Sequence, residues 1–111
     1  VAPEYEQKRF EPAEKRGRLR LVVSPDGADG AVRIHQDARL YAGLFDGEER
    51  ATHAIAPGRR AYVHVARGSV RVNGTALRAG DAVKADSVRE LVLDGGQDAE
   101  VLVFDLPGED A

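Results

Sequence analysis

The sequence predicts an all-β protein, a sandwich or barrel of about ten short antiparallel strands. Three observations support this fold class. Apolar and polar residues alternate with a period of two in several segments, turn residues recur at regular intervals, and no segment has a 3.6-residue period with caps at both ends. Short alternating segments separated by Gly, Asp and Asn turns are typical of sandwiches and barrels.

The stretch over residues 55–81 carries the clearest strand and turn signals. In residues 60–66 every second side chain is apolar, which is the pattern of a half-buried strand. Gly68 interrupts the pattern, and Asn73–Gly74 favours a type I′ hairpin because both turn residues tolerate positive φ. The pattern therefore predicts three strands, at residues 60–66, 69–72 and 75–78, before a turn at Gly80–Asp81.

Upstream of this stretch, residues 18–23 form the first predicted strand, and Pro25 with Gly27 marks the turn after it. Residues 31–45 alternate over too great a length for one strand. We expect two strands there, joined by a bend or bulge near residues 36–38. A bulge reverses which parity faces inward, so the faces of Arg39 and Tyr41 stay open at this point.

Downstream, alternation predicts strands at residues 50–56, 82–84, 88–93 and 99–106, with a hairpin loop over the Asp-Gly-Gly-Gln-Asp run at residues 94–98. The polar residues 1–14 read as an N-terminal arm or inter-domain linker, with a short strand near residues 5–9. Residues 15–106 form the predicted barrel, and residues 107–111 form an acidic tail.

Composition sets limits on function. The 111 residues are 42% hydrophobic and 32% charged, with a net charge of −3 and no cysteine. This balance gives no electrostatic reason to bind nucleic acid, and no apolar run has the ~20 residues that a membrane span needs. The absence of a secretory signal and of cysteine fits a cytoplasmic protein. With no initiator methionine, we expect a segment of a longer chain.

The spacing of IAPGRRAYVHVARGSVRVNGTALRAGD resembles the middle of a cupin barrel. Its flanks, RGRLRLVVSPDG and VRIHQDARLYAGLFDG, resemble the C-terminal half of pirin-like bicupin proteins. The resemblance extends over residues 5–106 and implies a jelly-roll barrel. Some proteins of this kind are described as quercetin dioxygenases, which open a flavonol ring with a metal (Fe, Cu, Mn or Ni) in the N-terminal cupin. That activity is implied for the parent protein rather than for this segment.

A metal-dependent cupin carries an H-x-H pair, a Glu and a later His, which hold the metal and leave positions open for substrate and dioxygen. If the motif's closing glycine is placed at Gly68, the Glu position becomes Ala61 and the H-x-H pair falls within residues 54–57. If the second motif begins at Gly80, its Pro, Gly and His positions become Asp86, Val88 and Leu91. The resemblance therefore implies a cupin domain that has lost its metal ligands.

An alternative set of ligands keeps catalysis open. Two or three histidines with a carboxylate suffice for a metal triad, so a metal-dependent dioxygenase or a small-molecule-binding cupin remains an alternative. Its candidate residues are His35, Asp37, His53 and His64. A third hypothesis is that the chain is a protein-interaction module, which the sequence neither supports nor excludes.

A structural role for the same polar residues is the interpretation we favour. Arg33, His35, Asp37, Tyr41 and Tyr62 are expected to form a buried or inter-sheet network, in which Asp37 orients His35 or pairs with Arg39. A ligand pocket built on His35, Asp37, Tyr41, Tyr62 and His64 is the alternative.

The sequence thus predicts a metal-free, non-catalytic C-terminal cupin domain with no cofactor of its own. Its expected partner is the N-terminal cupin of the parent chain, met through the N-terminal arm and one sheet face. A second copy of the same chain is the other expected partner.

Overall fold

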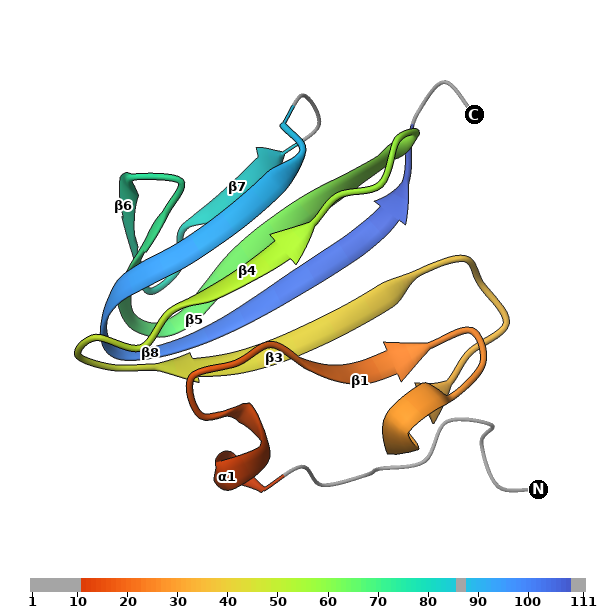
Figure 1. Ribbon diagram of the computed structural model, residues 1–111, viewed down its shortest axis with the longest axis horizontal. Coiled ribbons are helices and arrows are strands. Elements are labelled where there is room, and N and C mark those ends of the chain that lie inside the picture. Colours follow the sequence, from red (N-terminus) through yellow and green to blue (C-terminus); the bar gives the residue numbers. More distant parts are fainter. Residues whose placement is uncertain (1–10, 86–87, 109–111) are drawn as a thin grey trace.

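The computed structural model describes residues 11–85 and 88–108 and is mostly β-structure (Figure 1). Its helical parts are a single α-helical turn, α1 (Pro12–Lys15), and a 3₁₀ turn, η1 (Ala28–Gly30). The strands are β1 (Arg20–Ser24), β2 (Val32–Arg33), β3 (Arg39–Phe45), β4 (Ala51–Ala54), β5 (Arg59–Val72), β6 (Thr75–Arg78), β7 (Ala82–Ala85) and β8 (Glu90–Pro107). Among the described residues, no helix has the length and apolarity that a membrane span requires.

Two long strands, β5 and β8, organise the sheet, and they pair with each other along most of their length. Near the start of β5 and the end of β8, the pair is flanked by β7 and β3, and β1 and β2 continue the sheet beyond β3. At its other end, the pair is flanked by β6 and β4. The sheet therefore consists of two layers that share β5 and β8, which run through the centre of the view in Figure 1.

The bend between the layers requires glycine. In β5 it lies at Gly68, which has a φ of +69° and so occupies the left-handed region. A Cβ atom at Gly68 would lie 2.2 Å from the carbonyl oxygen of Asp98 in β8. The β5–β8 register shifts repeatedly between Val65 and Arg71, as expected where bulges bend a ladder.

The core fills the space between the layers. Val63, Val101 and Val103 from one layer and Leu91 and Leu93 from the other are fully buried, and they belong to one contiguous apolar cluster. Because side chains alternate along a strand, Tyr62, His64, Leu102 and Phe104 lie on the opposite, outer face.

That outer face is also apolar. Phe104 in β8 lies between Leu40 of β3 and Tyr62 of β5 in the strand register, and all three side chains are half-buried. Leu102 and Leu106 extend the row along β8 and are half-buried as well. β8 is therefore apolar on both faces, which is typical of a strand whose two faces are both covered.

The predicted all-β class and the positions of most turns are confirmed. Residues 31–45 form two strands, β2 and β3, with bends between them. Asn73 and Gly74 have φ values of +49° and +83°, as the predicted type I′ turn requires. The sequence left undecided which side of the sheet Arg39 and Tyr41 occupy. They align with Asp105 and Val103 of β8, respectively, and both side chains face inward. The strand expected near residues 5–9 lies outside the described residues.

The predicted hairpin loop at residues 94–98 is wrong. The described residues form eight strands, against the ten or so predicted for the whole chain. β8 continues through this run, with Asp94 aligned with Arg71 and Gln97 with Ser69 of β5. The glycines allow the strand to bend and do not reverse the chain direction. Glycine is needed at position 96 because a Cβ there would lie 2.7 Å from the carbonyl oxygen of Phe45. Likewise, Gly68 bends β5 without ending it. The helical turn α1 was not predicted from the sequence.

Replacing Gly68 with alanine tests the bend, with Gly47→Ala as the matched control. Both glycines have positive φ, +69° and +63°, but a Cβ at Gly47 would meet nothing within 4 Å. Gly47→Ala should lower the free energy of unfolding by about 1 kcal/mol, the cost of the left-handed backbone. Gly68→Ala should cost roughly 1–3 kcal/mol more, because the bend must open to relieve the clash. Equal losses in urea unfolding would show that the close approach at Gly68 is unimportant.

Candidate functional site: a charged cluster between the layers

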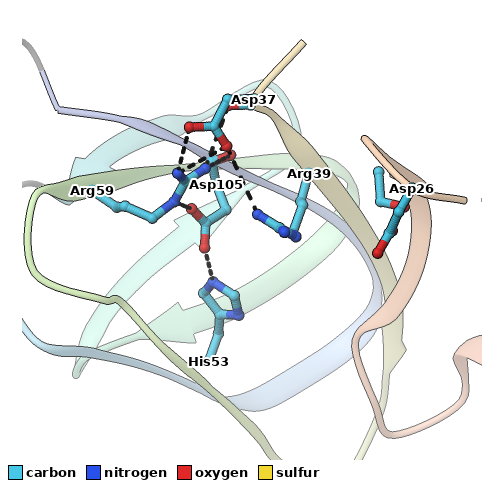
Figure 2. A network of polar contacts seen from close by, with 7 residues as sticks. Asp26, Asp37, Arg39, His53, Arg59 and Asp105 are labelled. Carbon is cyan, nitrogen blue, oxygen red and sulfur yellow. Dashed lines mark hydrogen bonds and ion pairs between the residues drawn. The ribbon is translucent and has the colours of Figure 1, made fainter. Parts of the chain in front are cut away.

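A cluster of charged side chains lies at one end of the core, where the two layers meet (Figure 2). Its centre is Asp105 in β8, whose strand neighbours are Arg39 in β3 and Ala61 in β5. Asp105 has the same inward parity as Val101 and Val103, and it is only 6% exposed. A buried carboxylate is costly unless it is paired and hydrogen-bonded, so its partners decide whether this arrangement is stable.

Arg59, the first residue of β5, is the main partner. Its Nε donates to Asp105 Oδ1 at 2.5 Å, and its Nη2 donates to the backbone oxygen of Asp105 at 3.2 Å. Its Nη1 lies 3.0 Å from both carboxylate oxygens of Asp37, in the connection between β2 and β3. The Asp105 carboxylate, and secondly that of Asp37, raise the pKa of Arg59. The guanidinium therefore joins the start of β5, the end of β8 and the β2–β3 connection.

His53 links the cluster to the second layer. It lies on β4, which pairs with the first part of β8, whereas Asp105 lies near the end of that strand. The distance between His53 Nε2 and Asp105 Oδ2 is 2.9 Å. The Tyr41 ring from β3 packs against the imidazole with a centroid separation of 4.8 Å. Burial, and secondly the negative charge of Asp105, raise the pKa of the Tyr41 phenol.

These contacts engage both oxygens of the buried carboxylate. Oδ1 accepts from Arg59 and Oδ2 contacts His53, while Arg59 also bonds Asp37. Arg39 lies 3.9 Å from Asp37 and adds a second guanidinium group to the cluster. The two positive charges of the arginines then balance the two negative charges of the carboxylates. A cluster whose members satisfy one another is suited to holding strands together.

The structure separates the residues that the sequence analysis singled out for a site. Asp37 and Tyr41 belong to the cluster, and the suggested Asp37–Arg39 pair is present at 3.9 Å. His35 is exposed in the β2–β3 connection, outside any strand. Tyr62 and His64 lie on the outer face of β5. The five candidate ligand-binding residues therefore do not converge on one point.

The residues present do not fit a metal ion. His53 faces the interior and His64 the outer face, so the set His35, Asp37, His53 and His64 is not assembled. Over residues 11–85 and 88–108, no three His, Cys, Asp or Glu side chains are placed to share a metal ion. Ala61 and Leu91, at positions where the resemblance places ligands, are fully buried members of the apolar core.

Sequence reasoning did not identify Arg59 and Asp105. Asp105 could have been identified, because it continues the inward parity of Val101 and Val103 and an acidic residue on that parity requires a cation. Arg59 has no comparable signal. It adjoins the Pro57–Gly58 turn beside a second arginine, and only the fold brings it to Asp105, 46 residues away.

The comparisons with known proteins agree with the fold. Residues 21–106 match the model of the quercetinase C-terminal cupin domain. The chain belongs to this family. A quercetin 2,3-dioxygenase of Escherichia coli K12 is 36% identical to this cupin domain over 107 residues, covering 96% of the chain and 45% of that protein. A putative quercetin 2,3-dioxygenase of Pasteurella multocida is 35% identical, again over 96% of the chain and 45% of the relative.

Among solved structures, YhhW from Escherichia coli superimposes on this cupin domain with a TM-score of 0.86 at 35% identity, over 97% of the chain and 45% of YhhW. A structure of the bacterial pirin YhhW in complex with nickel(II) gives a TM-score of 0.85 at 36% identity, with the same coverage. These findings confirm the resemblance to the C-terminal half of pirin-like bicupins. The chain spans somewhat less than half the length of these relatives.

Truncation of the buried carboxylate tests the cluster. Asp105→Ala leaves Arg59 and His53 without their shared partner, so the free energy of unfolding should fall by about 3 kcal/mol. Asp94→Ala is the matched control, because Asp94 lies on the same strand and pairs with Arg71 at 3.2 Å, but both side chains are substantially exposed. It should cost less than about 1 kcal/mol. Losses of similar size in chemical unfolding would contradict a stabilising role for the cluster.

Proposed function

We propose that this chain is a metal-free, non-catalytic cupin domain that packs against a metal-bearing N-terminal cupin in a pirin-like, quercetin dioxygenase-related protein. The observation that carries the proposal is the replacement of metal ligands by core side chains. Ala61 and Leu91 have no exposed surface, so side chains that cannot bind a metal fill these positions.

The inward-facing histidine supports the same conclusion. His53 contacts Asp105, and Arg59 engages the other oxygen of that carboxylate. A metal at His53 would have to displace a hydrogen bond within a buried, charge-balanced cluster. The domain therefore offers stability and shape to its partner and supplies no reacting group.

The outer face supports the packing. Leu40, Tyr62 and Phe104 form an apolar row across three strands, and Leu102 and Leu106 continue it along β8. The relatives are more than twice as long as this chain, so they contain a further domain. We assign that domain to this face, with Tyr62 and His64 as contact residues. A second copy of the chain is the alternative occupant when the further domain is missing.

The activity and its cofactor are assigned to the further domain. Relatives are named quercetin 2,3-dioxygenase, and one relative is described in complex with nickel(II). In the parent protein, Fe, Cu, Mn or Ni would then be held by the N-terminal cupin. An action on the flavonol quercetin would take place there, in the cytoplasm.

Metal analysis of the purified chain tests this division of roles. Protein prepared without chelator and dialysed against nickel(II) should contain far less than one metal ion per chain, because the aligned positions offer only apolar side chains. The matched variant is His53→Ala, which should leave this background unchanged. A stoichiometric metal ion that is lost in His53→Ala would overturn the proposal.

The same preparation tests the packing face. In the purified chain, we expect the half-buried apolar row to mediate self-association. Light scattering should give a dimer that Phe104→Glu converts to a monomer, whereas Arg78→Glu on β6, away from this face, should leave the dimer intact. A wild-type chain that stays monomeric at every concentration would argue against an interface at this face.

A further inference from the structure

A hollow opens into the core on the side of the molecule formed by β6 and β7. It has a volume of about 190 Å³ and is lined by residues from β5, β6, β7 and β8. Leu77 of β6 and Val83 of β7 form its walls, and both pack against the main apolar cluster. Leu91, which is fully buried, also lines it.

The bend at Gly68 explains why this side is open. β7 pairs with residues 61–64 of β5, before the bend, and β6 pairs with residues 69–72, after it. The two short strands therefore belong to different layers, and within the described residues no strand pairing joins them. At the charged cluster, by contrast, the layers are joined by the contact between His53 and Asp105.

The lining selects the chemistry of an occupant. Its walls are mostly aliphatic and include Val88, which is 43% exposed, but the charged side chain of Lys84 also belongs to the lining. A cationic ligand would lose its hydration there and meet the like charge of Lys84, so the hollow disfavours cations. Asn73 also lines it, but its amide is engaged with backbone groups of Glu90 and Val92. The Thr75 hydroxyl adds a polar group to the lining.

The size restricts the occupant further. An apolar cavity of about 150 Å³ in a protein stays dry and binds benzene. The hollow, at about 190 Å³, therefore accommodates one six-membered ring with a small substituent. It is smaller than the 300–1,000 Å³ or so of ordinary drug-sized pockets, so it cannot enclose a compound of three rings.

We infer that the hollow between β6 and β7 is a binding site for a small single-ring compound with one polar substituent and no positive charge, such as a phenol. The ring would pack on Leu77, Val83 and Leu91, and its substituent would point toward Thr75. Leu91 stands where the cupin pattern has a histidine, so an apolar side chain here takes the place of a metal ligand. The inference does not depend on the proposed function, because it requires neither a second domain nor the absence of a metal elsewhere.

The test is an NMR titration of the 111-residue chain with phenol, and with benzylammonium as a cationic probe of similar size. Phenol should cause saturable amide shifts at Leu77, Val83 and Leu91, whereas benzylammonium should cause none at these positions. Phenol shifts that stay linear up to its solubility limit, or equal saturable binding of benzylammonium, would overturn the inference.

Variants on β6 locate the site. Leu77→Phe fills the hollow and should weaken phenol binding at least tenfold. Ala76→Phe is the matched control, because Ala76 is the neighbouring residue on the same strand and does not line the hollow. This variant should bind phenol with the affinity of the wild type. If Leu77→Phe does not fold, Val83→Phe fills the hollow from the opposite wall. Unchanged affinity in the folded filling variant would refute the assignment.

Discussion

The buried carboxylate of Asp105 is the constraint on which much of this fold depends. It lies on the inward parity of β8, among valines, and would be unfavourable there without its two partners. Arg59 satisfies one oxygen and extends to Asp37, and His53 contacts the other oxygen from the opposite layer. Three segments far apart in the sequence are thereby held at one end of the core. The same contacts occupy the inward-facing histidine, which links the stability of the domain to the proposed absence of a metal.

The bend in β5 and β8 gives the molecule two unlike ends. Gly68 and Gly96 lack Cβ atoms where backbones of neighbouring strands approach closely, so one pair of long strands can serve both layers. On one side the layers are joined by charges, and on the other β6 and β7 diverge and leave an apolar hollow. The outer face of β8 is a third surface, apolar and half-buried. In our proposals, the outer face serves a partner domain and the hollow serves a small ligand, so the two roles fall on different surfaces.

Local sequence signals predicted the fold class and several turns, because those features depend on neighbouring residues. Asn73–Gly74 is an example, since positive φ at both positions is a property of the dipeptide itself. The Gly95–Gly96 run was misread because the same residues permit a reversal or a bend, and only packing against Phe45 decides between them. The site was predicted in part: Asp37 and Tyr41 belong to the cluster. Arg59 meets Asp105 through contacts 46 residues apart, which no local pattern specifies.

A double-mutant cycle between His53 and Asp105 tests the central claim most directly, because their contact joins the two layers across 52 residues of sequence. The free energies of unfolding of the wild type, His53→Ala, Asp105→Ala and the double variant give the coupling energy between the two side chains. A hydrogen bond to a buried charged group should give a coupling of about 1.5–3 kcal/mol. A coupling indistinguishable from zero, with the two losses simply adding, would contradict the account.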